Sequence, residues 1–256
     1  MPDQITANVA SKLIRIDPGS VQPPDFDHFV CANEYGFYSV PGSFVNRKVP
    51  ALLAYGDVYE PNTLKLMRRL AGSGDVVSGG AFVGDFFPAL SEAMDPGARL
   101  YSFEPNPTTY ASALHTIALN DLQNVHLAPV AVGAKAGVLP LKVAGFDNRA
   151  LAAGARILTE PEPGETVDVD VVTLDTLIPQ DRHISILHLD IEGFERPALQ
   201  GARALVLRCK PVIIVEVGKP RPMRLFAEFL NDMLGTALYR PSGLIERNAI
   251  FVAEDG

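Results

Sequence analysis

The sequence predicts an α/β protein whose mostly parallel sheet carries helices on both faces. Three observations support this class. Apolar runs that suit buried strands alternate with amphipathic segments that suit helices, and the connections between them are short. Several of the runs end in a glycine or an acidic residue, as at residues 75–79, 99–104 and 184–190. The chain has 256 residues, enough for one large domain with a substantial core.

The composition limits which cellular compartment and which classes of binding partner are expected for the protein. The formal net charge is -8 and no basic run is present, which argues against nucleic acid as a partner because binding to phosphates draws on clustered Lys and Arg. Cys31 and Cys209 lie far apart and fit no metal or redox spacing, so a reducing compartment is expected. The first residues lack the basic and apolar regions of a leader, and no apolar run approaches the roughly 18 residues of a membrane span. We therefore expect a cytoplasmic protein that does not bind a membrane.

Residues 1–58 predict an irregular N-terminal arm. The segment is rich in Pro, Asp, Asn and aromatic residues and shows little periodicity, and a short strand is expected near residues 36–40. We expect the arm to close the edge of the sheet. Arms of this kind also cover a site or make a dimer contact, so a homo-oligomer is a further expectation.

Residues 59–256 predict the α/β domain itself. One helix begins at Pro61 and ends before Gly72, and a later one begins at Pro107 with Asn106 as its N-cap. The expected buried strands cover residues 75–79, 99–103, 125–132, 184–190 and 211–217. Further helices are expected over residues 86–94, 198–206 and 225–234, and two last strands near residues 236–239 and 249–253.

The stretch between residues 133 and 174 has a different pattern. Val alternates with Asp over residues 167–172, and residues 138–143 form a second short run, so half-exposed antiparallel strands are expected. The loop between them, residues 145–154, is rich in Gly, Ala and Asn. It is a candidate site lid or substrate loop, with the alternative that it has no role at the site.

The chemistry is expected at the glycine-rich end of the strand at residues 75–79. Gly80 and Gly84 allow a ligand to approach the backbone closely, and the first turn of the following helix offers free N–H groups. About 20 residues later, Glu104 stands at the tip of the second strand, where a carboxylate can accept hydrogen bonds from both hydroxyls of a ribose. Together they predict a nucleoside-bearing cofactor, with the alternative that the glycines serve only strand–helix packing.

Further polar residues lie at the carboxyl ends of the predicted strands, where open α/β sheets bind ligands. His188, Asp190 and Glu192 could share one side by strand alternation. Crowded carboxylates raise one another's pKa, so one could act as a general base, or the group could hold a divalent cation; we assign no metal. The alternatives are a hydrogen-bonded core histidine and a helix N-cap with a first-turn acid. Glu60 precedes a helix and is either a surface carboxylate or a ligand-facing one.

These features together resemble the FkbM-type family of S-adenosylmethionine-dependent methyltransferases. The resemblance runs from about Tyr59 to Val252. Its most specific parts are residues 103–107 (FEPNP), 174–177 (LDTL) and 189–195 (LDIEGFE), with Gly201 and Ala202 after them. It implies a Rossmann-like class I methyltransferase fold with a seven-stranded, mostly parallel sheet. It also implies S-adenosylmethionine as the cofactor and an enzyme that O-methylates a hydroxyl of a sugar, a glycan or a natural product.

The resemblance also assigns residues to roles. Glu104 would hold the ribose hydroxyls with Asn106 beside it, and the turn from Gly80 to Gly84 would cradle the methionine part of the cofactor. The full set of implied cofactor-binding residues is Glu60, Ser78, Gly80, Ala81, Gly84, Glu104 and Asn106. Since methyl transfer needs an aligned acceptor oxygen and removal of its proton, we expect the Asp190–Glu192 segment to orient the acceptor, with Asp190 or His188 as the base.

The sequence departs from the family pattern at three positions. Ser78 and Phe82 stand where the family usually has an acid and an amide in the glycine turn, and His188 stands where it commonly has Lys. One alternative is therefore a non-enzymatic or degenerate protein that binds a nucleoside weakly. A second alternative is an NAD-type oxidoreductase, although Gly80 and Gly84 do not complete the Gly-x-Gly-x-x-Gly spacing of that class.

Overall fold

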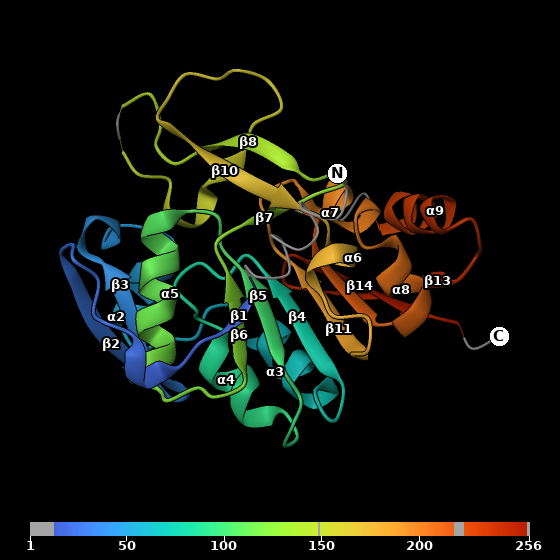
Figure 1. Ribbon diagram of the computed structural model, residues 1–256, viewed down its shortest axis with the longest axis horizontal. Helices are drawn as coiled ribbons and strands as arrows, with labels where there is room; N and C mark the ends of the chain where they lie inside the picture. Colours follow the sequence, from blue (N-terminus) through green and yellow to red (C-terminus); the bar gives the residue numbers. More distant parts are fainter. Residues whose placement is uncertain (1–12, 148, 218–222, 255–256) are drawn as a thin grey trace.

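The computed structural model describes residues 13–147, 149–217 and 223–254. Its main sheet has the strand order β1-β6-β5-β4-β11-β12-β14-β13 (Figure 1). The strands are β1 (Ile14–Arg15), β6 (Val125–Ala128), β5 (Leu100–Phe103), β4 (Asp75–Gly79), β11 (Ile184–Leu189), β12 (Val212–Glu216), β14 (Asn248–Ala253) and β13 (Tyr239–Ile245). The predicted mostly parallel α/β architecture is confirmed.

The parallel part of the sheet contains the point where strand order reverses. From β4 the chain moves outward through β5 to β6, and it then returns to the other side of β4 to form β11 and β12. β14 joins β12 in the antiparallel direction, and β1 adds an antiparallel strand at the opposite edge. The sheet therefore has eight strands where seven were expected, because the short β1 of the N-terminal arm closes its edge.

Helices cover both faces of this sheet. One face packs against α3 (Pro61–Leu70), α4 (Phe87–Ala93) and α5 (Pro107–Leu119). The other packs against α6 (Leu174–Leu177), α7 (Glu195–Gln200), α8 (Arg203–Cys209) and α9 (Met223–Leu234). Val76 and Val77 show the alternation, since each belongs to the core on a different face. No helix among the described residues combines the length and apolar character that crossing a bilayer requires.

The described part of the N-terminal arm is more ordered than predicted. It contains a hairpin of β2 (His28–Asn33) and β3 (Gly36–Pro41), followed by α2 (Lys48–Ala54). The hairpin lies beside α5 (Figure 1), and its core side chains meet Phe82 and Val83 of the glycine turn. The arm thus covers the turn as well as closing the sheet edge. Residues 1–12 lie outside the described part.

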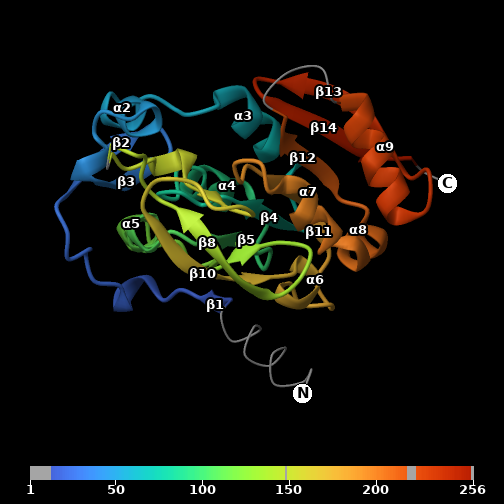
Figure 2. The ribbon, with the colours of Figure 1, turned by 90° about the horizontal axis from the view of Figure 1, so that it is seen from above.

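A second sheet has the order β7-β10-β8-β9. Its strands are β7 (Ala131–Val132), β8 (Gly137–Lys142), β9 (Arg156–Ile157) and β10 (Thr166–Val172). The predicted antiparallel pairing of the two alternating runs is confirmed, with Asp170 opposite Val138. This sheet lies over the end of the main sheet at which the parallel strands terminate (Figures 1 and 2).

Three predicted elements differ from the structure. The strand expected over 125–132 divides at Pro129, which has no N–H for a ladder, so its last residues join the second sheet as β7. The helix expected over 198–206 divides into α7 and α8 at Gly201, where a Cβ would lie 2.1 Å from the carbonyl oxygen of Gly133. The strand expected near 236–239 begins only at Tyr239, whose backbone is held by the Asn231 side chain.

Candidate functional site

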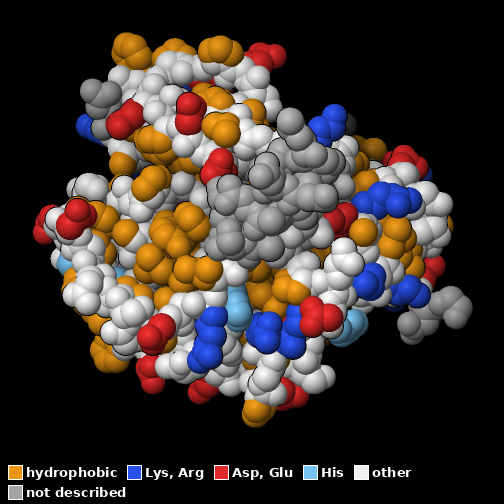
Figure 3. Space-filling view, viewed as in Figure 1, with side chains coloured by type: hydrophobic (Ala, Val, Ile, Leu, Met, Phe, Trp, Pro, Cys, Tyr) orange, Lys and Arg blue, Asp and Glu red, His pale blue; other side chains and the backbone are white. Residues whose placement is uncertain are grey.

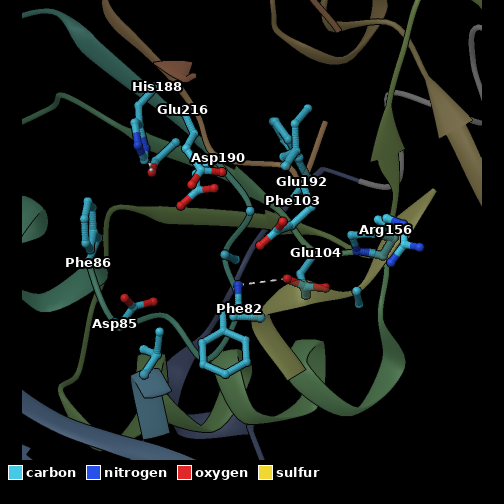
Figure 4. Close-up of a pocket in the computed structure, with 18 of the residues that line it drawn as sticks. Phe82, Asp85, Phe86, Phe103, Glu104, Arg156, His188, Asp190, Glu192 and Glu216 are labelled. Atoms are coloured by element: carbon cyan, nitrogen blue, oxygen red, sulfur yellow. Dashed lines mark hydrogen bonds between the residues drawn. The ribbon is translucent and has the colours of Figure 1, made fainter. Parts of the chain in front are cut away.

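A pocket lies at the carboxyl ends of β4, β5, β11 and β12, where the strand order reverses (Figure 4). Ligands of open α/β sheets bind at this position. The space measures about 1070 Å³, including the part that opens to solvent. Val49 and Tyr59 close one side, and Ala152 and Ala153 from the loop at residues 145–154 close another. This loop therefore lies at the candidate site, and its role as a lid or substrate loop stays a prediction.

Most predicted site residues line this pocket, and some do not. The lining residues among them are Ser78, Gly80, Ala81, Glu104, His188, Asp190 and Glu192. Glu60, Gly84 and Asn106 are absent from the lining, so these three predicted cofactor-binding residues do not face the pocket directly.

The glycine turn brings two strand ends together. Gly80 has φ +82°, and a Cβ there would lie 2.0 Å from the carbonyl oxygen of Asp190, so the position excludes any side chain. Gly84 has φ +78°, and a Cβ there would meet the Phe87 ring. Glycine at this position therefore serves the packing of α4 and does not shape the pocket wall. Phe82 also has a positive φ, +48°, and its ring stacks on Phe44 with centroids 6.4 Å apart. The turn is thus held by packing on both sides.

Glu104 is fixed by backbone donors at the tip of β5. Its Oε2 accepts from the N–H of Phe82 at 2.8 Å, and its Oε1 accepts from the N–H of Asn106 at 2.9 Å. Burial raises the pKa of Glu104 to about 7, although these N–H groups act in the opposite direction. The Thr109 side chain also donates to this carboxylate, which has about four lone pairs, so the three protein donors leave room for a ligand hydroxyl. The Asn106 side chain caps α5 by accepting from the N–H of Thr108, so this residue supports Glu104 from behind.

His188 and Ser78 form a buried pair on neighbouring strands. The Ser78 Oγ and the His188 Nδ1 lie 3.1 Å apart, and the imidazole stacks on Phe86 with centroids 5.6 Å apart and planes 13° apart. Burial lowers the pKa of His188 to about 4, so the ring is neutral at ordinary pH. Within the described residues, the His188 Nε2 has no hydrogen-bond partner.

Three carboxylates gather just beyond the end of β11 and at the end of β12. Asp190, Glu192 and Glu216 each place an oxygen within 4.8 Å of the others. Burial raises the pKa of Asp190 well above its ordinary value, and the charge of Glu216 and a hydrogen bond with it raise the pKa further. Such a group could hold a divalent cation. The Arg247 guanidinium lies 2.8 Å from Glu216 and already supplies one positive charge.

Glu60 stands outside the pocket wall. It precedes α3 with φ +45°, and its Oε2 accepts a hydrogen bond from the Asn248 side-chain amide. Its carboxyl group is buried, with a raised pKa. Its charge also contributes to the raised pKa of Asp190 and Asp85. Glu60 therefore influences pocket residues through its charge and does not itself line the pocket.

The sequence reasoning missed several lining residues. Asp85 follows the glycine turn, lines the pocket and has a pKa raised to about 7, mainly by burial. Its place next to Gly84 was a usable signal. Arg156 and Arg247 also reach the pocket, from β9 and from the turn between β13 and β14. No local pattern indicated these two, because only the fold brings them to the strand ends.

The fold is that of the Rossmann-like class I methyltransferases. A methyltransferase FkbM from Methylobacillus flagellatus KT is similar with a TM-score of 0.50 and 17% identity, over 70% of this chain and 43% of that one. TYW2 from M. jannaschii, solved in complex with AdoMet, is similar with a TM-score of 0.50 and 14% identity, over 92% of this chain and 90% of that one. The family model of the methyltransferase FkbM domain matches residues 78–240. The chain belongs to this family, as the sequence motifs predicted.

This chain thus spans less than half of the Methylobacillus protein. No curated protein matches the sequence.

Proposed function

We propose that the protein transfers a methyl group from S-adenosylmethionine to a hydroxyl oxygen of a sugar, a glycan or a natural product. The observation that carries this proposal is the placement of Glu104. Its carboxylate is fixed at the tip of β5 by two backbone N–H groups and lies beside the turn at Gly80, in a fold of the methyltransferase class. A fixed acidic group next to a side-chain-free turn suits a nucleoside.

The residues present fit such a cofactor. Glu104 would accept from a ribose hydroxyl, since its carboxylate has a lone pair left beyond the bonds from the two backbone N–H groups and from Thr109. Gly80 and Ala81 would offer backbone close to the methionine part, because the wall at Gly80 carries no Cβ. When bound, S-adenosylmethionine supplies an electrophilic methyl group on a sulfonium sulfur.

Asp190 is the base we propose for the acceptor. The protein must align the acceptor oxygen and remove its proton, and orientation supplies much of the acceleration. Burial and Glu216 raise the pKa of Asp190, so this carboxylate binds a proton more readily than an exposed one. His188 was the other candidate, but its pKa, lowered to about 4 by burial, makes it a weak base. Glu192, on the same wall, would help to orient the acceptor.

The acceptor that this site suits is a small molecule or a glycan. The charged groups on the pocket wall are mostly carboxylates, which would repel a phosphate backbone. On the face seen in Figure 3, basic side chains lie in small groups with acidic side chains next to them. With a net charge of -8, these features favour a hydroxylated small acceptor over nucleic acid.

Isothermal calorimetry tests the proposal. The purified chain is titrated with S-adenosylmethionine, S-adenosylhomocysteine and NAD, and the titrations are repeated with Glu104→Ala and with Glu228→Ala, which removes a half-exposed carboxylate on α9. We expect micromolar binding of the first two ligands, lost in Glu104→Ala and kept in Glu228→Ala. Methyl transfer from labelled S-adenosylmethionine is then screened over hydroxylated acceptors.

Two results would contradict the proposal. Binding of NAD alone would favour the oxidoreductase alternative. No binding of any of the three would favour a degenerate nucleoside site, which the replacements at Ser78 and Phe82 suggested from the sequence.

A further inference from the structure

The pair of Ser78 and His188 forms the floor of the pocket between β4 and β11. The parallel register places these two residues directly opposite each other. Each follows a core residue by two positions, Val76 and Ile186, so both side chains project to the face that α3 and α4 cover. Ser78 is 5% exposed and His188 is 4% exposed. Polar groups this deeply buried must find partners or lose free energy.

Counting protons identifies the tautomer of His188. The Ser78 hydroxyl has one hydrogen to donate, and Nδ1 of His188 is its partner at 3.1 Å within the described chain. If Nδ1 carried the ring proton, the hydroxyl hydrogen would have no acceptor and Nε2 would have no donor. If Nε2 carries it, the hydroxyl donates to Nδ1 and only the Nε2–H stays unsatisfied. The second arrangement leaves fewer buried polar groups unpaired.

The remaining N–H is held in one place. The imidazole stacks on Phe86, and its strand neighbour on the far side is Ile214 in β12. These contacts and the hydrogen bond from Ser78 restrict the ring. His188 lines the pocket, where Figure 4 shows it on the same wall as Asp190 and Glu216. Among the described residues nothing accepts from Nε2, and this atom has almost no contact with solvent, so a ligand oxygen reaches it only when neighbouring side chains of the pocket floor move aside.

We propose that Ser78 fixes His188 as a neutral hydrogen-bond donor, and that its Nε2–H holds an oxygen atom of the bound ligand. The inference rests on the proposed methyltransferase function. It makes Ser78 a positioning residue and leaves the removal of the acceptor proton to a carboxylate such as Asp190. The oxygen has two sources: the carboxylate of the cofactor's amino-acid end, or a hydroxyl of the acceptor.

Nitrogen-15 NMR of the full chain tests the tautomer. The chain has five histidines, and His188→Phe identifies the signals of residue 188 by their loss. Long-range proton–nitrogen spectra distinguish a protonated ring nitrogen from a bare one. We expect a protonated Nε2 and a bare Nδ1. A protonated Nδ1, or a doubly protonated ring at neutral pH, would overturn the proposal.

Two variants of Ser78 separate positioning from mere packing. Ser78→Ala removes the donor to Nδ1, so the two nitrogen signals should move toward each other as the tautomers mix. Ser78→Thr keeps a hydroxyl and should restore the wild-type spectrum. Unchanged nitrogen shifts in Ser78→Ala would show that the serine does not set the tautomer and would refute its role.

Three probes identify the source of the oxygen. S-adenosylhomocysteine carries the amino-acid end, methylthioadenosine lacks it, and methyl α-glucoside supplies hydroxyls. A shift of the His188 Nε2–H with the first but not the second assigns the cofactor carboxylate, and a shift only with the glucoside assigns an acceptor hydroxyl. No shift with any probe would overturn the donor role. If calorimetry shows that neither nucleoside binds, the proposed function fails, while the tautomer measurement still decides the state of His188.

Discussion

Gly80→Ala should damage both the fold and the site, because this turn touches the segment that carries Asp190. The new Cβ would lie 2.0 Å from the Asp190 carbonyl oxygen, about 1 Å closer than real Cβ contacts allow. The backbone at Gly80 also has φ +82°, which an L side chain adopts at a cost of about 1–2 kcal/mol. Relief of the contact requires the end of β11 to move away from the turn.

The structure gives a magnitude for this change. Overpacking costs about 1–3 kcal/mol, and separation of the strand ends strains the hydrogen bond from the Asp190 N–H to the Gly79 carbonyl, worth about 1 kcal/mol. With the strain at φ, we expect a loss of about 3–6 kcal/mol in the free energy of unfolding. Gly97→Ala is the matched control, since Gly97 has φ +88° but nothing within 4 Å of its Cβ position. Its expected loss is about 1–2 kcal/mol.

Urea unfolding followed by circular dichroism measures both variants. Any folded Gly80→Ala protein should also bind S-adenosylmethionine at least about tenfold more weakly, a difference of about 1.4 kcal/mol, while Gly97→Ala keeps wild-type affinity. If the two variants lost the same stability within about 0.5 kcal/mol, the close approach of the turn to Asp190 would not be what fixes glycine at position 80.

Three further results are expected. Burial raises the pKa of Glu104 and of Asp85 to about 7, so between their ordinary pKa values and about pH 7 the folded state holds protons that the unfolded chain has lost. The free energy of unfolding should therefore fall as pH rises from about 5 to about 8. The double variant Glu104→Gln, Asp85→Asn should flatten that slope in urea titrations. Asp190→Asn should lower turnover by about 10²- to 10⁴-fold in a saturating assay with little change in cofactor affinity, and unchanged turnover would remove its role as base. Phe44→Ala deletes the ring stacked on Phe82 and should weaken cofactor binding several-fold in calorimetry, since the Phe82 N–H holds Glu104.

Local sequence signals predicted the part of the fold that local chemistry determines. Asn106 caps α5 and Pro107 begins it, as their order in the sequence indicated. The apolar runs that end in Gly79, Glu104 and Asp190 are neighbouring strands whose ends meet at one pocket. These features need only near neighbours in the chain, and the parallel arrangement then brings the strand ends together.

The features that sequence reasoning missed depend on contacts between distant residues. At Gly201, where the helix breaks, the backbone of Gly133 lies too close for any side chain, and no pattern near Gly201 records that contact. Arg247 pairs with Glu216 only because β14 returns beside β12. The Asn248 side chain, also on β14, donates a hydrogen bond to Glu60 for the same reason. Such pairs form after the chain has folded, so periodicity and capping rules cannot predict them.

Ser78 and Phe82, which depart from the family pattern at the glycine turn, both have structural partners. These partners change how the departures are interpreted. Phe82 adopts a left-handed backbone conformation, which costs about 1–2 kcal/mol. Its ring is buried against Phe44, and burial of a phenylalanine side chain stabilises the folded state by about 1.5–3 kcal/mol, which offsets that cost. Ser78 meets His188, so a neutral pair occupies the two positions where the family usually carries an acid and a lysine. In this chain the Phe82 N–H still donates to Glu104, and Gly80 still lies against the Asp190 carbonyl oxygen. The replacements therefore alter what holds the turn, and loss of cofactor binding does not follow from them.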